Sequence, residues 1–267
     1  MTGDFQHRYG PWAVIAGASE GIGASLADEL AGRGLNLVLI ARNEKLLNEV
    51  AAGVRDRHGA QVLAVVQDLT DADVAARLAR ATEGLEIGLV IYNAGASDRT
   101  TPFLETGFDH ALKQIKLDCI GPVALVDLFA PALRDRGRGG IVLVASLACV
   151  AGSATLVVYS AVKAFQHNFA EGLWAELREY GVDVCCTPLG ATFTPALQRM
   201  GVEYDPATQM LSEDVAREIT DNIGNGPVHV VGENNRAVAS HIWTVDRRTL
   251  VEMMSTAAID FADKREF

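Results

Sequence analysis

The chain has 267 residues, of which 49% are hydrophobic, and it carries a formal net charge of −11 at pH 7. A chain of this length and composition can bury a large core without disulfides and suits a single α/β domain. No long run of Lys or Arg occurs. The sequence therefore lacks the basic surface that binding to nucleic acid or to an anionic membrane requires.

The cysteines and the first residues bear on the compartment. Four cysteines are present and none has zinc-ligand spacing, so we expect reduced thiols and no metal site. Residues 1–9 are polar and lack the apolar segment of a secretion signal, and no window of eighteen uncharged apolar residues occurs. The sequence therefore predicts a soluble, cytoplasmic protein with no membrane span.

Short apolar runs alternate with segments of helical periodicity along the chain. The expected strands are 13–16, 35–40, 61–66, 88–92, 140–145, 182–187 and 228–231. The expected helices are 21–33, 43–58, 71–81, 103–136 and 157–180. Repeated β-α alternation, with strands rich in Val, Leu and Ile, predicts an α/β fold: a Rossmann-like, doubly wound parallel sheet of about seven strands with helices on both faces. Residues 1–267 are expected to form one domain.

A glycine-rich turn follows the first expected strand, with the sequence Gly17-Ala18-Ser19-Glu20-Gly21-Ile22-Gly23. The spacing G-x-x-x-G-x-G differs from the common dinucleotide fingerprint, but the physical requirements are the same. Gly17 allows a tight turn, Gly21 lets backbone amides approach a pyrophosphate, and Gly23 lets the next helix pack closely on the sheet. At the first β-α junction, this turn predicts a dinucleotide site that includes Ser19 and Ile22.

The end of the second expected strand bears on the choice of cofactor. An acidic residue there would bond the ribose 2′-hydroxyl, but the sequence has Arg42, whose guanidinium suits a 2′-phosphate. Glu20 argues the other way, because a carboxylate near that phosphate would weaken binding. We therefore favour NADP(H) over NAD(H). The alternative for Arg42 is a solvated charge at the start of a helix.

Two later stretches fit the same cofactor cleft. Asp68, followed by Leu69, lies just past the third expected strand and could accept a hydrogen bond from an adenine amino group. Its alternative role is that of a helix-start Asp. Asn93, Ala94 and Gly95 follow the fourth expected strand, where small residues let the chain skirt a ribose, although this tripeptide is also ordinary turn chemistry.

Ser146, Tyr159 and Lys163 have the spacing of an acid–base site. On a helix, Tyr159 and Lys163 stand four residues apart and share one face. A tyrosine hydroxyl normally keeps its proton until about pH 10, and a neighbouring ammonium favours the phenolate. Ser146, thirteen residues before the tyrosine, could steady a carbonyl or alkoxide oxygen. The alternative, which a Tyr-x-x-x-Lys pattern alone would favour, is an ordinary amphipathic helix.

With these motifs in chain order, residues 10–195 resemble the short-chain dehydrogenase/reductase family. The sequence Tyr9-Gly10-Pro11-Trp12-Ala13 and the stretch 228–250 are similar to one subgroup, the 3-oxoacyl-CoA reductase and type 12 17β-hydroxysteroid dehydrogenase-like proteins. The resemblance implies an NAD(P)(H)-dependent oxidoreductase. It implies that Tyr159 is the general acid/base, that Lys163 lowers the pKa of the tyrosine and bonds the nicotinamide ribose, and that Ser146 positions the substrate oxygen.

The sequence departs from the family pattern in two places. Asp118 stands where the family usually has an Asn that holds a water in a proton relay. An Asp can hold a water too, but it carries a charge and lacks the amide donor. The family's Pro-Gly turn corresponds to Pro188-Leu189-Gly190, with one extra residue. The threonine that bonds the nicotinamide carboxamide is then either Thr192 or Thr194.

Residues 189–212 correspond to the mobile substrate lid of the family. Its apolar residues suit a hydrophobic pocket and, equally, core packing; they are Phe193, Leu197, Met200, Met210 and Leu211. Steroids, fatty acyl thioesters and aromatic ketones all stay open as substrates, because specificity depends on the shape of the pocket.

The sequence therefore predicts an enzyme that interconverts a ketone or 3-oxoacyl thioester and a secondary alcohol on a hydrophobic small molecule. The alternative is a non-catalytic NADP(H)-binding sensor or scaffold, which the Asp at position 118 favours. The expected helices 103–136 and 157–180 are apolar on more than one face, which predicts a homodimer or homotetramer.

Overall fold

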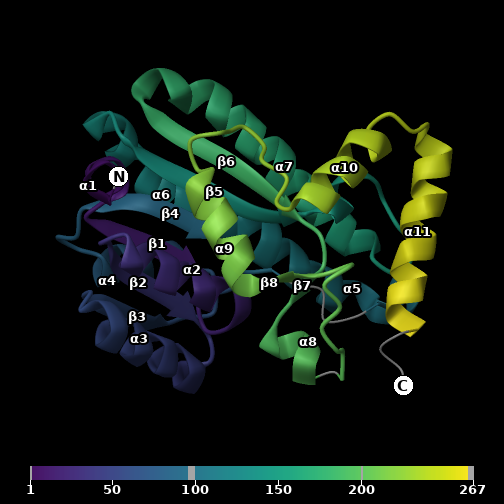
Figure 1. Cartoon of the computed structure of the whole chain (residues 1–267), viewed down its shortest axis with the longest axis horizontal. Helices are drawn as coiled ribbons and strands as arrows, with labels where there is room; N and C mark the ends of the chain where they lie inside the picture. The colour runs from purple at the N-terminus through teal and green to yellow at the C-terminus, as the bar shows by residue number, and fades with distance from the viewer. Residues whose placement is uncertain (1, 96–99, 200, 264–267) are drawn as a thin grey trace.

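The structure is a computed structural model that describes residues 2–95, 100–199 and 201–263. Met200 of the expected lid lies outside the described residues. A single central sheet lies between layers of helices (Figure 1). Within the described residues, no helix is both long enough and apolar enough to cross a bilayer.

The central sheet is six-stranded and parallel, in the order β3-β2-β1-β4-β5-β6. Its strands are β1 (Trp12–Ala16), β2 (Asn36–Ala41), β3 (Val62–Val66), β4 (Ile87–Tyr92), β5 (Gly139–Ser146) and β6 (Val182–Leu189). The chain builds the sheet outward from β1 in one direction and from β4 in the other. In such sheets, ligands bind beyond the carboxyl ends of the strands where the order reverses. The predicted doubly wound fold is confirmed.

The segment 228–231, which we expected to be a seventh strand, lies along the outer edge of β6. It pairs with β6 at an isolated bridge between Cys186 and Val228. His229 and Val231 donate backbone hydrogen bonds to the carbonyls of Cys186 and Pro188, at 2.9 and 3.2 Å. Gly232 follows with a φ of +93°, which turns the chain away into the next helix and ends the pairing.

Helices cover both faces of the sheet, because side chains that alternate along each buried strand supply two separate cores. Ile15 packs into one core and Val14 into the other. The first core is closed by α2 (Gly21–Gly32), α3 (Glu44–His58) and α9 (Ser212–Asp221). The second is closed by α4 (Val74–Ala81), α6 (Gly121–Arg136) and α7 (Val157–Leu177).

The expected helix 103–136 is divided into three parts. They are α5 (Phe103–Ile115), a π-helical turn η1 (Lys116–Ile120) and α6. Gly107, with a φ of +77°, interrupts α5 as well. A π turn inserts extra backbone and changes the direction in which side chains point, and such turns occur frequently at functional sites. Here the turn carries Asp118, whose side chain is fully buried.

The remaining elements are shorter or follow the sheet. They are α1 (Thr2–Tyr9), the 3₁₀ turns η2 (Leu147–Val150) and η3 (Arg178–Tyr180), β7 (Thr192–Phe193), α8 (Pro195–Arg199), β8 (Met210–Leu211), α10 (Glu233–Ile242) and α11 (Arg247–Asp263). The expected lid, residues 189–212, is therefore ordered in part, because β7 pairs with β8 in parallel. Leu197 of α8, within this segment, is buried.

The C-terminal helix α11 lies at one edge of the molecule, beyond α10 and far from α1 (Figure 1). It packs on the turn η2 that follows β5, where Val150 and Leu250 share a small apolar cluster. Arg247 Nη1 donates to the carbonyl of Val150 at 2.6 Å, and Ser255 Oγ accepts from the amide of Ala154 at 2.9 Å. The C-terminal segment thus supports the chain that leads from β5 to α7.

Candidate active site

The glycine turn after β1 closes only because it carries no side chains at critical positions. Gly17 has a φ of +86°, and its amide donates to the carbonyl of Ile40 at 2.8 Å. A Cβ at Gly17 would lie 2.7 Å from the amide nitrogen of Ala94, and one at Gly23 would lie 2.0 Å from the carbonyl oxygen of Gly17. Neither position tolerates a methyl group. In the same turn, Ile22 packs against the core and Ser19 is half-buried.

The turn after β4 meets the glycine turn at the point where the strand order reverses. Asn93 Nδ2 donates to the carbonyl of Gly17 at 2.9 Å, and the Asn93 amide donates to the carbonyl of Ala16 at 3.0 Å. Gly95 follows with a φ of +123°, and a Cβ there would lie 1.9 Å from Asp118 Oδ1. The structure thus brings the predicted cofactor turns into contact with the helix that carries Asp118.

Arg42 and Asp68 lie together at the ends of β2 and β3. Arg42 Nη1 is 3.8 Å from Asp68 Oδ2, and the Arg42 side chain is exposed. Asp68 Oδ1 accepts from the Thr70 amide at 2.9 Å and from the Thr70 hydroxyl at 2.8 Å, which is the local turn role. Burial raises the pKa of Asp68, but the bonds from Thr70 and the charge of Arg42 outweigh it, and the pKa is lowered. The Leu69 side chain is buried in the core.

Glu20 of the glycine turn is paired with Arg199 of α8. Arg199 Nη2 donates to both carboxylate oxygens, at 3.0 and 2.8 Å. The sequence did not indicate this contact, because the two residues are 179 positions apart. The Glu20 carboxylate, which we expected to weaken binding of a 2′-phosphate near Arg42, is therefore paired with a cation from the lid segment.

The segment after β6 lies across from the glycine turn. Pro188 is buried within β6, and a Cβ at Gly190 would lie 2.2 Å from Asn235 Oδ1, so α10 packs directly on this turn. Thr192 belongs to β7. Thr194 Oγ1 accepts from the amide of Leu197 at 3.4 Å, and a Cβ at Gly21 would lie 3.1 Å from Thr194 Cγ2. Of the two candidate threonines, Thr194 has its methyl group facing Gly21 of the glycine turn.

Ser146, Tyr159 and Lys163 come from adjacent elements. Ser146 ends β5, and its Oγ accepts from the amide of Ala148 at 3.2 Å, which starts η2. Tyr159 lies in the first turn of α7, half-buried, with Lys163 one turn later. The Lys163 Nζ is 5.7 Å from the centroid of the Tyr159 ring. Because α7 packs against η2, the three predicted residues gather at one end of the sheet.

Lys163 is engaged by a buried carboxylate. Its Nζ lies 2.9 Å from Asp118 Oδ1, and both side chains are almost fully buried. Nζ also lies 3.1 Å from Gln166 Oε1 and 3.4 Å from the carbonyl of Val144. Burial is the largest single cause and lowers the pKa of Lys163, but the charge of Asp118, its hydrogen bond and the neighbouring Tyr159 together outweigh burial, and the pKa is raised above its ordinary value. The ammonium therefore stays charged inside the protein.

Gln166 completes this cluster and was missed by the sequence analysis. Its Nε2 donates to the backbone carbonyl of Asp118 at 3.0 Å, while its Oε1 accepts from Lys163. Gln166 follows Lys163 by three residues on α7, a spacing that places two helical side chains on one face. That spacing was the available signal, although it does not separate a buried amide from a surface amide.

The four cysteines are free thiols. Burial is the main cause that raises the pKa of Cys149 and of Cys185, to about 12 in each case. Across the described ranges, no group of His, Cys, Asp and Glu side chains could hold a metal ion.

Residues 11–205 match the family model described as short chain dehydrogenase. The match covers most of the chain and includes the glycine turn, Ser146, Tyr159 and Lys163. The chain belongs to the short-chain dehydrogenase/reductase family. The resemblance that the motifs indicated is thereby confirmed, and with it the general activity of the family, oxidoreduction between carbonyl compounds and alcohols.

Two kinds of relative are similar to this short-chain dehydrogenase/reductase in sequence. A 7beta-hydroxysteroid dehydrogenase of Clostridium sardiniense is 28% identical over 251 residues, which cover 93% of this chain and 95% of the relative. A very-long-chain 3-oxoacyl-CoA reductase of Neurospora crassa is 37% identical over 181 residues, which cover 66% of this chain and 54% of the relative. The chain thus spans about half the length of the latter relative.

Solved structures agree with these relatives. The structure of a 7beta-hydroxysteroid dehydrogenase, studied for its stereoselectivity, superposes with a TM-score of 0.87 and 25% identity, covering 94% of this chain and 98% of that chain. A short-chain dehydrogenase from Sphingobium yanoikuyae, in complex with NADPH, superposes with a TM-score of 0.77 and 30% identity, covering 86% of this chain and 92% of that chain. The similarity to the first extends over nearly the whole fold.

Proposed function

We propose that this chain is an NADP(H)-dependent oxidoreductase that interconverts a ketone and a secondary alcohol on a hydrophobic substrate. The observation that carries the proposal is the placement of Tyr159 one turn before a buried, charged Lys163, whose partner Asp118 packs against Gly95 of the turn after β4. An ammonium that stays charged next to a phenol favours proton release from that phenol. Membership of the family supports the same reaction type.

The residues of the site divide the chemistry among them. A bound nicotinamide supplies or accepts the hydride. Tyr159 donates a proton to the substrate oxygen during reduction and takes it back during oxidation. Ser146, at the end of β5, holds that oxygen with its hydroxyl. Lys163 keeps a positive charge near the phenol and can bond the ribose of the cofactor.

The cofactor fits the cradle made by the glycine turn and the neighbouring turns. The dinucleotide would lie against Gly17, Ser19, Gly21, Ile22 and Gly23, where the glycines leave room for backbone amides. Its adenine half would lie near Asp68 and Leu69, and its nicotinamide half would lie near the turn 93–95 and the segment 188–194, where Thr194 is favoured over Thr192.

NADP(H) is preferred over NAD(H) in this proposal for two reasons. Arg42 extends its guanidinium beside Asp68 at the end of β2, where a 2′-phosphate would lie. Glu20, the residue that would repel the phosphate, is neutralised by Arg199. The Sphingobium yanoikuyae relative was solved with NADPH, which agrees with this preference.

The substrate is a hydrophobic ketone or 3-oxoacyl thioester, held under residues 189–212. This segment acts as a lid, since Phe193 of β7 and Met210 and Leu211 of β8 are partly exposed apolar side chains, while Thr194 and Arg199 contact the glycine turn. The names of the relatives support a steroid or an acyl thioester. The likeness to the 7beta-hydroxysteroid dehydrogenase covers more of both chains and favours a compact, multi-ring ketone.

A panel assay tests the proposal. NADPH and NADH oxidation is followed with steroid ketones, 3-oxoacyl thioesters and aromatic ketones. We expect turnover with at least one class and a loss of about a thousandfold or more in Tyr159→Phe, with NADPH affinity unchanged. Tyr180→Phe, at an exposed tyrosine of η3, is the matched control. Tight NADPH binding without turnover on any ketone would instead support a cofactor-binding sensor or scaffold.

A further inference from the structure

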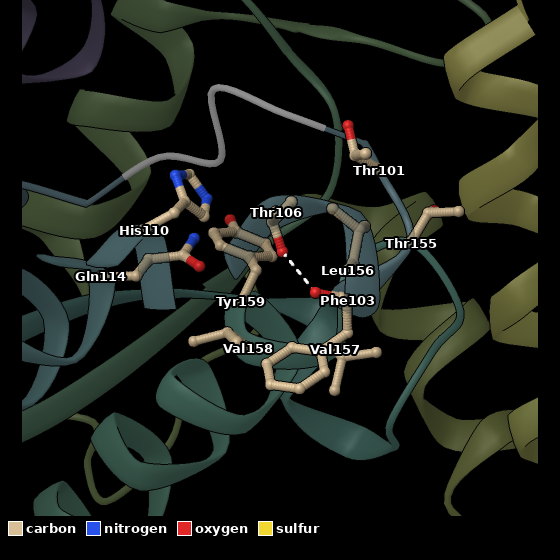
Figure 2. A pocket seen from close by; sticks show the side chains of 10 residues that line it. All are labelled: Thr101, Phe103, Thr106, His110, Gln114, Thr155, Leu156, Val157, Val158 and Tyr159. Atoms are coloured by element: carbon tan, nitrogen blue, oxygen red, sulfur yellow. Dashed lines mark hydrogen bonds between the residues drawn. The ribbon is translucent and has the colours of Figure 1, made fainter. Parts of the chain in front are cut away.

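A narrow cavity lies between α5 and the first turn of α7, and Tyr159 forms part of its wall (Figure 2). Gln114 and His110 line it from α5, and Thr155 lines it from the chain just before α7. In Figure 2, the side chain of Gln114 points from α5 toward Tyr159, while Thr155 lies at the other end of the cavity. The cavity is therefore continuous with the predicted site of proton transfer.

Gln114 brings an unsatisfied donor to this cavity. Its side chain is only 7% exposed, and its Nε2 has no hydrogen-bond partner among the described residues. A buried amide without a partner costs stability, and natural proteins satisfy nearly all such groups. An unsatisfied donor that faces a cavity therefore points to a group that enters the cavity and accepts a hydrogen bond.

The packing of two helices brings Gln114 next to Tyr159. Asp118 lies one turn after Gln114, and Lys163 lies one turn after Tyr159. The bond of 2.9 Å between Asp118 and Lys163 ties the two helices together at that level. Gln114 and Tyr159 each lie one turn before this pair, on the same sides of their helices, so they face each other as well. Both residues accordingly line the same cavity. The amide and the phenol thus approach one small volume from opposite helices.

Thr155 marks the far end of the cavity. Its φ is +62°, a conformation that is strained for a β-branched residue. Its Oγ1 is buried and has no hydrogen-bond partner in the described part of the chain. Strain of this kind persists where the surrounding structure holds it, and it concentrates at ligand sites. Two unsatisfied polar groups therefore line one cavity.

We propose that this cavity is a polar subsite in which Gln114 donates a hydrogen bond to a second oxygen of the substrate, close to the reacting carbonyl. The inference rests on the proposed ketone reduction and adds a specificity to it. The described residues that line the cavity include no Lys, Arg, Asp or Glu, so the second oxygen is best supplied by a neutral group: a hydroxyl, a ketone, or the carbonyl of an ester or thioester.

The test compares a 3-oxo ester with the monoketone of equal length in which the ester is replaced by methylene groups. Binding is measured calorimetrically in the presence of NADP⁺, under which no reduction occurs, and kcat/KM is measured with NADPH. The variant is Gln114→Met, which keeps the length of the side chain and removes the donor. Thr106→Val is the control, because Thr106 lines the same cavity while its hydroxyl donates to the Phe103 carbonyl of its own helix.

We expect Gln114→Met to weaken binding of the 3-oxo ester about tenfold, as expected for one buried hydrogen bond, and to leave the monoketone within about twofold. The decrease in kcat/KM should come from a higher KM, with kcat nearly unchanged. Equal losses for both ligands would overturn the proposal, since they would indicate packing or a bound water. Wild-type protein that does not discriminate between the ligands would overturn it too. Selective binding without turnover would preserve the subsite and refute the proposed reaction.

Discussion

Asp118 Oδ1 lies 2.9 Å from Lys163 Nζ, inside the protein and away from solvent. A carboxylate therefore contacts the lysine directly, where the family usually has an amide that holds a water. Gln166 and the carbonyl of Val144 supply further bonds to the ammonium. Breaking such a pair leaves a buried charge without compensation, which typically costs about 3–5 kcal/mol.

Asp118→Asn should change the alkaline limb of the activity profile. The substitution keeps the shape and removes the Asp118 charge, the largest of the causes that raise the pKa of Lys163, so that pKa should fall below its present, raised value. The alkaline limb of kcat/KM should then move to lower pH by about one unit or more, while kcat at the optimum stays within about tenfold. Asp127→Asn, on the exposed face of α6, should leave the profile unchanged.

The same variant should lose stability in a pH-dependent way. The pKa of Lys163 is higher in the folded state than in the unfolded state. The charged lysine therefore adds to the free energy of unfolding at every pH below the ordinary lysine pKa, and this stabilisation is lost as the pH rises through the pKa of the folded state. The variant should therefore have a lower melting temperature than the wild type at pH 7, and the difference between the two melting temperatures should become smaller above about pH 10.5. Thermal melts at several pH values measure this, and a constant gap would contradict it.

Gly95→Ala should lower both stability and activity, because the added methyl group would collide with Asp118. Its Cβ would lie 1.9 Å from Asp118 Oδ1, and the φ of +123° is strained for alanine. We expect a loss of at least about 2 kcal/mol in unfolding free energy, together with most of the activity. Denaturant unfolding is the measurement. Gly172→Ala, in open space within α7, should instead gain about 0.5–1 kcal/mol.

Arg199→Ala should weaken NADPH binding more than NADH binding. The substitution frees the Glu20 carboxylate, which then repels a 2′-phosphate near Arg42. Because the pair is partly exposed, the effect should be modest, about two- to fivefold in the ratio of the two dissociation constants. Fluorescence titration with each cofactor measures this ratio. The double variant Arg199→Ala with Glu20→Gln should restore it, and failure of that rescue would show that the carboxylate is not responsible.

The apolar faces of α6 and α7 are expected to pair with a second copy of the chain. Leu125 and Phe129 of α6 are buried in the core, but Val123 of α6 and Phe165 of α7 stay exposed. The ring of Phe165 stacks on that of Phe169, 5.6 Å away, which widens the patch. Sedimentation equilibrium at micromolar concentration should give at least twice the 28.5 kDa of one chain.

A charged residue in this patch tests the pairing. Phe165→Glu should yield a single-chain species, because burying an unpaired charge opposes association. Val66→Glu, at an exposed position on β3, is the control and should leave the assembly unchanged. A wild-type protein that sediments as one chain with full activity would overturn the expectation.

The sheet was predictable from sequence because its strands are buried on both faces, so runs such as 35–40 and 88–92 read as apolar segments between helices. The edge segment 228–231 also reads as a strand, but it is shorter and the chain turns away at Gly232, so it pairs with β6 only at an isolated bridge. The helices α10 and α11 were missed, since their apolar residues cover only a narrow contact. The interruption at η1 also has no clear sequence signal.

The placement of the candidate site residues was predictable where a residue type and a spacing suffice. Tyr159 and Lys163 need only a helix, and Gly17 and Gly23 need only a tight β-α turn. Contacts between distant segments were not predictable: Arg199 with Glu20, and Asp118 with Lys163, depend on how α8 and η1 are placed. Gln114 was missed for the same reason, because only its burial beside Tyr159 distinguishes it from a surface glutamine.

The helix α11 lies beyond residue 205, where the family match ends, yet it fastens the chain that connects Ser146 to Tyr159. The support for the chain between Ser146 and Tyr159 is therefore encoded far from those residues. Exchanging residues 233–263 with those of a relative would leave the proton-transfer groups unchanged and would act on the cavity only through the chain before α7, which carries Thr155. Selection in the C-terminal segment could then adjust one wall of the cavity from outside the family match.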